Sequence, residues 1–249
     1  MPFAQLQWSS DALQKMVGLN VILPSVGEPP YPTFYLLHGL SDDYTAWHRR
    51  TRIEWYAREY PFIIVMPDGY RGFYTRNEAG PDYDTYMARE LPAFVERYFQ
   101  ASPQGDRRCI GGLSMGGYGA LRLALAYPDV FGSVTSHSGA VLNGTRPNAI
   151  SSLNSEEMRR IFGDNPQGTQ HDIVHLARRA LGIGSLPAIR LDCGEDDFLI
   201  EHNRVLHEAF STLGVEHEYQ EYPGSHSWDY WDLRIQEALA WHAARLGYV

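Results

Sequence analysis

The sequence predicts an α/β fold, in which a mostly parallel central sheet carries helices on both faces. Short apolar runs typical of buried strands alternate along the chain with longer stretches of helical periodicity, which is the pattern of strand–helix–strand units. Prolines fall between these segments, where they interrupt neither a helix nor a strand: Pro128, Pro147, Pro166 and Pro223. Because crossovers of this kind join parallel strands, we expect a functional site at the carboxyl ends of the strands.

The expected elements follow in chain order. Two antiparallel strands come first, at 3–8 and 15–23, and parallel strands follow at 33–38, 62–66, 107–113, 131–137, 188–193 and 216–222. Helices are expected at 44–59, 84–100, 116–127, about 155–162, 171–181, 201–213 and 228–245. The long excursion at about 140–185 is expected to form a small lid-like insertion. No change in composition marks a linker, so residues 1–249 are expected to form a single domain.

The composition argues against several classes of partner. A net charge of −9 disfavours binding to nucleic acid and to anionic membrane surfaces. The segment 1–10 lacks the basic end and the long apolar core of a signal peptide, and no apolar run approaches the length of a membrane span. We therefore expect a cytoplasmic protein that does not act at a membrane.

The cysteines and histidines do not suggest a metal or redox site. Cys109 and Cys193 fall in predicted buried strands, where a free cysteine behaves as a small apolar residue, so a disulfide is not expected. His171 and His175 stand at i and i+4 but lack the glutamate of a His-Glu-x-x-His motif. The sequence therefore predicts neither a metal site nor a cofactor.

One serine lies in a G-x-S-x-G pattern that runs from Gly112 to Gly116, between the strand at 107–113 and a helix rich in small residues. In a nucleophile elbow the serine occupies a sharp, strained turn that exposes its hydroxyl above the sheet. The glycines have a physical role there, because a side chain at either position would collide with the adjacent strand and helix. Ser114 is therefore the candidate nucleophile.

A serine needs a base and an orienting carboxylate, which follow it in the chain order Ser, acid, His in proteins with a nucleophile elbow. An acidic loop at 195–197 follows the seventh predicted strand, and His226 lies in a Gly/Ser turn after the eighth. These positions predict a triad of Ser114, Asp197 and His226. Spacing alone does not choose among the three carboxylates of the loop.

The predicted strand at 33–38 ends in His38-Gly39, and the glycine lets the chain turn tightly enough to aim a backbone N–H at a developing oxyanion. That donor is the N–H of Leu40, and the second is the N–H of Met115, directly after the candidate nucleophile. The loss of one such donor costs ~3 kcal/mol of transition-state stabilisation. His38 is interpreted as a brace for this loop, because His226 already holds the place of the base.

These segments together resemble the esterase D-like family, also called the putative esterase family, of the α/β-hydrolase superfamily, and most resemble its small bacterial tributyrin and acetyl esterases. The residues that carry the resemblance lie between about 20 and 235: Leu36-Leu37-His38-Gly39-Leu40 with Trp47, Val65-Met66-Pro67-Asp68-Gly69, Phe73-Tyr74-Thr75, Glu90-Leu91-Pro92, Gly112-Leu113-Ser114-Met115-Gly116-Gly117, Asp197-Phe198-Leu199 and Gly224-Ser225-His226-Ser227-Trp228. The resemblance implies an α/β-hydrolase fold and favours Asp197, because the acid of this family commonly precedes a Phe-Leu pair. The extra acidic residue before it departs from the family pattern and keeps Asp196 as an alternative.

The resemblance and the triad together predict a serine carboxylesterase that hydrolyses small, short-acyl esters through an acyl-enzyme, with a small-molecule ester as its partner. Alternatives that the same residues would serve are a thioesterase of the S-formylglutathione hydrolase type, a polysaccharide acetyl or feruloyl esterase, and an acyltransferase. A non-catalytic binding module is disfavoured, because such modules usually lose the serine or the histidine. Since members of the family associate, the resemblance is also compatible with a homo-oligomer.

Five side chains near the predicted site are candidates for the substrate pocket: His38, Trp47, Phe73, Tyr74 and Trp228. Most aromatic residues belong to a core, so each is weighed against that role. Phe73 and Tyr74 follow a Pro-Asp-Gly turn at the end of a strand, which makes them the best placed of the five to contact a substrate.

Overall fold

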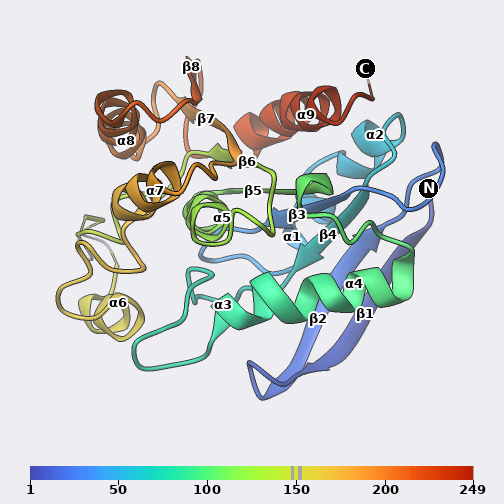
Figure 1. Cartoon of the computed structure of the whole chain (residues 1–249), viewed down its shortest axis with the longest axis horizontal. Coiled ribbons are helices and arrows are strands. Elements are labelled where there is room, and N and C mark those ends of the chain that lie inside the picture. The colour runs from blue at the N-terminus through green and yellow to red at the C-terminus, as the bar shows by residue number, and fades with distance from the viewer. Residues whose placement is uncertain (147–148, 151–152, 249) are drawn as a thin grey trace.

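A single central sheet of eight strands organises residues 1–146, 149–150 and 153–248, which the computed structural model describes. The strands run in the order β1-β2-β4-β3-β5-β6-β7-β8 (Figure 1). Their bounds are β1 Phe3–Ser10, β2 Lys15–Ile22, β3 Thr33–Leu37, β4 Ile63–Pro67, β5 Arg108–Leu113, β6 Ser133–His137, β7 Ala188–Gly194 and β8 Glu218–Tyr222. Strand β2 pairs antiparallel with β1 and β4, and all the other pairs are parallel. The expected, mostly parallel sheet is therefore confirmed.

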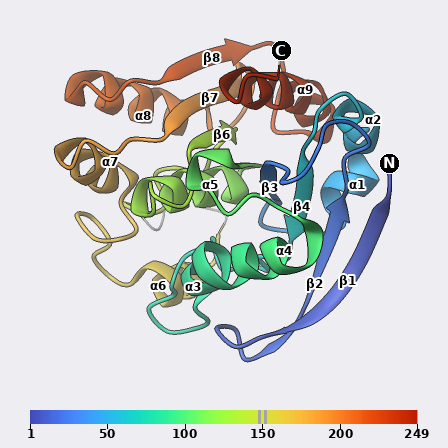
Figure 2. The same ribbon diagram turned by 45° about the vertical axis from the view of Figure 1, so that its right-hand side comes forward.

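Helices cover both faces of this sheet, as expected. They are α1 Ala46–Arg50, α2 Ile53–Ala57, α3 Tyr83–Thr85, the π-helical turn η1 Tyr86–Glu90, α4 Leu91–Phe99, the 3-10 turn η2 Gly105–Arg107, α5 Met115–Ala126, α6 Ser155–Phe162, α7 Ile173–Gly182, α8 Ile200–Leu213 and α9 Trp228–Arg245. Buried side chains of α4, α5, α7 and α8 form one core cluster, and those of α1, α2 and α9 form the other. Figure 2 shows α9, α1 and α2 gathered on one side of the sheet, away from α4. No helix in the described part of the chain is long and apolar enough to cross a membrane.

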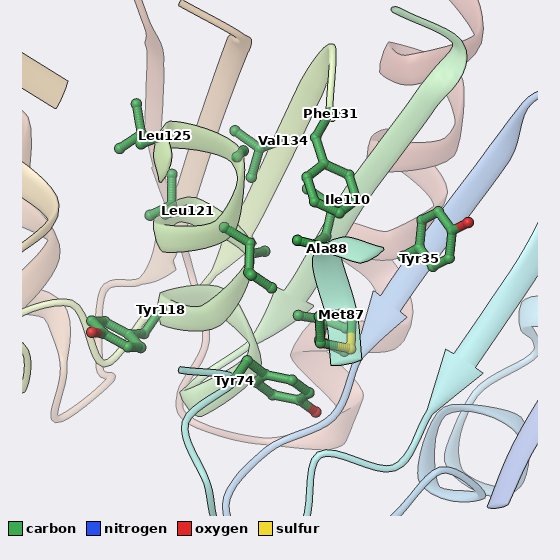
Figure 3. Packing of buried hydrophobic residues seen from close by; sticks show 14 of the residues in the cluster. Tyr35, Tyr74, Met87, Ala88, Ile110, Tyr118, Leu121, Leu125, Phe131 and Val134 are labelled. Carbon is green, nitrogen blue, oxygen red and sulfur yellow. The ribbon is translucent and has the colours of Figure 1, made fainter. Parts of the chain in front are cut away.

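The larger cluster fixes the strand and helix that carry the candidate nucleophile. In Figure 3, Leu121 and Leu125 of α5 lie beside Val134 of β6, while Tyr74 and Tyr118 lie at the other end of the cluster. All five side chains are fully buried. Full burial of a Leu or Val side chain stabilises the fold by ~2 kcal/mol. The first turn of α5 is therefore anchored to the sheet by its own packing.

The prediction of one continuous helix at 44–59 is wrong, because the structure has two separate helices there, α1 and α2. Thr51 adopts an extended conformation (φ −131°, ψ 172°), and its hydroxyl donates to the Trp47 carbonyl at the end of α1. The N–H of Arg52 donates to the Asp232 carboxylate of α9 at 2.8 Å. A long-range contact in this case overrides a continuous helical pattern.

The segment 140–185 contains two helices with different surroundings. Helix α7 packs on α5 and α8, with Leu176 and Ala177 almost completely buried in the larger cluster. Helix α6 lies beside the loop that precedes α3 (Figure 1), and its Met158 and Phe162 are buried in the same cluster. Residues 147–148 and 151–152 lie outside the described residues. Both helices thus contribute to the core, and the lid-like insertion and a single domain over 1–249 stay predictions.

Candidate active site

The turn between β5 and α5 has the backbone geometry of a nucleophile elbow. Ser114 has φ 53° and ψ −115°, a conformation that residues with a side chain rarely adopt. A Cβ at Gly112 would lie 2.7 Å from the Leu37 carbonyl oxygen, and one at Gly116 would lie 2.5 Å from the same atom. Both positions therefore require glycine. The Ser114 N–H donates to the carbonyl of His137 in β6 at 2.9 Å, which fixes the turn against the neighbouring strand.

Of the three carboxylates in the acidic loop, Asp197 is the one that contacts the candidate base. Its two oxygens lie 3.0 and 2.9 Å from His226 Nδ1, and its side chain is buried. One of these oxygens also accepts the Leu199 N–H at 2.8 Å, which holds the carboxylate in place. Glu195 and Asp196 are exposed. With Nδ1 donating to the carboxylate, His226 Nε2 is left free to accept a proton.

Two aromatic rings contact the His226 ring. Phe198 packs at a centroid distance of 4.5 Å, and Trp231 of α9 meets the ring edge-on at 4.8 Å. The Trp231 indole N–H donates to the Ser138 hydroxyl at 3.2 Å, so this ring is itself fixed to the sheet. Among the described residues, no hydrogen bond joins the Ser114 hydroxyl to His226. In many enzymes this bond tightens only in the substrate complex.

Two backbone N–H groups near the nucleophile, the expected oxyanion donors, have no acceptor among the described residues. The loop after β3 approaches closely, because a Cβ at Gly39 would lie 3.9 Å from Ser114 Cβ and 2.7 Å from a Leu113 methyl carbon. The Leu40 N–H, one residue further on, donates to no other group in the part of the chain that the structure describes. Met115 is the first residue of α5, where an N–H has no acceptor within the helix.

His38 braces this loop from inside the protein. The Gly69 N–H donates to His38 Nε2 at 2.9 Å, so the proton of the neutral ring is on Nδ1, which donates to the Gly39 carbonyl at 2.8 Å. Because Nε2 already accepts that bond, its 3.5 Å separation from Asp68 is not an ion pair. The Tyr74 hydroxyl donates to the His38 carbonyl and accepts from the His38 N–H, at 3.1 and 3.0 Å. These bonds fix the backbone that carries Leu40.

Comparison with known proteins adds the family to this geometry. The family model described as "Putative esterase" matches residues 10–242. The chain belongs to this esterase family. An acetyl esterase of Caldicellulosiruptor saccharolyticus is 32% identical, and the match covers 97% of this chain and 98% of that protein.

Solved structures agree with the esterase assignment. The fluorophosphonate-binding serine hydrolase F of Staphylococcus aureus is 30% identical, with a TM-score of 0.89 over 97% of this chain and 98% of its own. An S-formylglutathione hydrolase of the same organism is also 30% identical, with a TM-score of 0.86 over the same shares of the two chains. The fold of the esterase is thus the α/β-hydrolase fold, and its activity is that of a serine-type carboxylic ester hydrolase.

The expected substrate pocket needs a correction. His38, Trp47, Phe73 and Tyr74 are each at most 1% exposed, so they lie beneath the site of the esterase and do not line a surface that a substrate reaches. The physical reason for the last two is the backbone. Phe73 and Tyr74 have φ values of 50° and 52°, and these successive turns direct both rings into the core. Trp228 is partly exposed.

A buried polar cluster behind the site was not foreseen. His137 Nδ1 lies 2.6 Å from the Asp192 carboxylate, whose other oxygen accepts the Tyr230 hydroxyl at 2.8 Å. The Tyr230 ring packs so closely on Gly224 that a Cβ there would lie 2.7 Å from it. The cluster therefore supports the loop that carries His226. The register of β6 and β7, which pairs His137 with Asp192, is the signal that could have found it.

The remaining candidate groups do not form a second reactive site. In residues 1–146, 149–150 and 153–248, no group of three or more His, Cys, Asp or Glu side chains could hold a metal ion. Cys109 and Cys193 are free and buried. Burial raises the pKa of the Cys109 thiol to about 12 and moves the pKa of Cys193 in the same direction, so neither is a thiolate near neutral pH.

Proposed function

We propose that Ser114, His226 and Asp197 form a catalytic triad with which the esterase hydrolyses small esters of short acyl chains. The observation that carries the proposal is the bond of about 3 Å from His226 to the buried Asp197. Both residues follow the carboxyl ends of parallel strands, as does the strained turn of Ser114. A carboxylate in that place keeps the Nδ1 proton of the imidazole and leaves Nε2 as the base.

The reaction follows two steps of acyl transfer. His226 Nε2 takes the proton of the Ser114 hydroxyl as the oxygen attacks the ester carbonyl, and the Leu40 and Met115 N–H groups stabilise the negative oxygen that forms. The alcohol leaves with the proton from His226, which produces an acyl-enzyme. Water then gives up a proton to His226, attacks the acyl-enzyme and releases the acid and the free serine.

The proposed preference for short acyl chains is supported by the burial of three aromatic side chains and by the name of one relative. Trp47, Phe73 and Tyr74 are at most 1% exposed, so these rings offer no open apolar surface to a long acyl chain. The name of the acetyl esterase relative supports the same preference.

A thioesterase of the S-formylglutathione hydrolase type is the second candidate, because one solved relative carries that name. The exposed carboxylates of Glu195 and Asp196 beside the triad oppose it, since glutathione itself bears carboxylates. The two free cysteines support the further proposal that the enzyme works in a reducing, cytoplasmic compartment.

The test is steady-state hydrolysis of p-nitrophenyl esters from acetate to decanoate. We expect kcat/KM to peak at acetate or butyrate, and Ser114→Ala to lower kcat by about 10⁴-fold or more without loss of fold. Ser136→Ala is a matched control, because Ser136 is a buried serine of the adjacent strand. Absence of ester turnover by folded wild type, or full activity in Ser114→Ala, would refute the proposed triad. Faster turnover of S-formylglutathione than of any ester would favour the second candidate.

A further inference from the structure

We propose that Phe198 forms a binding surface for the alcohol part of the ester, and that the enzyme therefore prefers esters whose alcohol carries an uncharged apolar ring. The inference rests on the proposed function. Phe198 combines two properties: its side chain is 63% exposed, and its ring contacts the ring of His226 at a centroid distance of 4.5 Å. An exposed aromatic ring beside a general base is available to a ligand and is not consumed by the core.

The chemistry decides which part of the substrate meets this ring. When the tetrahedral intermediate breaks down, the C–O bond to the alcohol cleaves, and the departing oxygen receives the proton held by His226. That oxygen must lie within about 3 Å of His226 Nε2. A substituent on it extends away from Ser114 past the imidazole, where Phe198 lies. The acyl group remains on Ser114 and does not pass His226.

The loop holds Phe198 in place before a substrate arrives. On one side, the Asp196 N–H donates to the Gly224 carbonyl at 2.9 Å. On the other side, the Leu199 N–H donates to the Asp197 carboxylate at 2.8 Å. With the backbone fixed before and after it and the ring itself in contact with His226, Phe198 loses less conformational freedom when a ligand covers it, which favours binding.

The charge of the loop restricts the ligand further. Glu195 and Asp196 are exposed and take part in none of the ion pairs formed by the described residues. Two uncompensated carboxylates next to Phe198 repel an anionic leaving group and leave a neutral one unaffected. A benzyl-type or other neutral cyclic alcohol can pack on the Phe198 ring and is not repelled by the two carboxylates.

A purely protective role makes a different prediction. If Phe198 only covers the bond between His226 and Asp197 from water, its removal slows every ester equally. If it binds the alcohol, its removal slows only esters whose alcohol reaches it. Ethyl acetate and benzyl acetate separate the two roles, because they give the same acetyl-enzyme and release alcohols of similar basicity.

The experiment compares kcat/KM for these two esters in wild type, Phe198→Ala and Phe198→Leu. For Phe198→Ala we expect a loss of about 5- to 10-fold with benzyl acetate, mainly through KM, and a loss under about 2-fold with ethyl acetate. Phe198→Leu should retain part of the preference. Phe3→Ala is the matched control: Phe3 is also exposed and stacks on a histidine, His48, but it lies on β1 at the opposite edge of the sheet.

Each outcome decides between the proposals. Equal losses with both esters would assign Phe198 a protective role and overturn the inference, and so would unchanged activity with benzyl acetate. Failure of the proposed function looks different, because wild type would then hydrolyse neither ester or Ser114→Ala would hydrolyse both.

Discussion

We expect acid to destabilise this esterase, and the largest single contribution to come from the buried His242 of α9. Its side chain is fully buried, and its ring nitrogens lie 2.8 Å from the Ser133 hydroxyl and 3.3 Å from the Thr135 hydroxyl. Burial lowers the pKa of His242 from 6.5 to about 3, and the neighbouring His137, Arg245 and Arg190 act in the same direction. The folded protein therefore keeps this ring neutral where an unfolded chain would protonate it.

The sign and size of the effect follow from these two pKa values. Below pH 6.5 the unfolded state binds a proton that the folded state excludes, so stability is complete above pH 6.5 and falls until the folded pKa of about 3. Each pH unit in that window costs about 1.4 kcal/mol, so His242 alone removes about 2 kcal/mol by pH 5. That is a large fraction of the ~5–15 kcal/mol that stabilises a typical domain.

The assay is urea unfolding at pH 8, 7, 6 and 5, followed by tryptophan fluorescence, for wild type and His242→Gln. Glutamine keeps a hydrogen-bonding side chain that does not titrate, so the variant should start less stable but lose about 2 kcal/mol less between pH 8 and pH 5. His171, His202 and His217 also have lowered pKa values, but they act equally in both proteins and cancel in the difference. A parallel pH dependence in the two proteins, or a titration of His242 near pH 6.5 by NMR, would refute the reasoning.

Three further predictions concern the site, each followed with p-nitrophenyl acetate. Asp197→Asn should lower kcat by about 10³- to 10⁴-fold, whereas Asp196→Asn should stay within about 2-fold; similar losses in both would contradict the choice of acid. Tyr74→Phe leaves the N–H and C=O of His38 without a partner and should lower kcat by about 10-fold at nearly constant KM, and an unchanged kcat would show that the loop holds itself. Tyr230→Phe should lower the unfolding free energy by about 1–3 kcal/mol and kcat by less than about 10-fold; an unaltered urea midpoint would show that the buried carboxylate does not need this bond.

The fold was predictable because its local signals agree with one another. Apolar runs of strand length alternate with helical periodicity, and the elbow glycines stand where only a hydrogen atom fits against Leu37. The division of the helix at 44–59 was not predictable, because it depends on Asp232, about 180 residues away. Local pattern carries no information about a partner so distant in the chain.

The site was predictable in its chemistry and less so in its surroundings. Chain order identified Ser114 and His226 as candidates, and the family resemblance favoured Asp197. Spacing alone did not separate Asp197 from Asp196, because the burial that distinguishes the two carboxylates is not visible in adjacent residues of a sequence. Phe73 and Tyr74 follow the end of a strand, where we expected their side chains to face a substrate. Their positive φ values turn both side chains into the core. Whether an aromatic side chain lines a substrate pocket or is buried in the core depends on tertiary structure, which the local sequence does not determine.

The cluster of His137, Asp192 and Tyr230 has a consequence for how this enzyme loses activity on unfolding. The backbone of His137 holds the turn of Ser114, while its side chain leads through Asp192 to Tyr230 and so to the loop of His226. The Ser114 turn and the His226 loop are thus both held by the same buried cluster, which joins the sheet to α9. We therefore expect the Ser114 turn and the His226 loop to lose their structure together, so that denaturant abolishes activity at the same concentration at which it unfolds the protein.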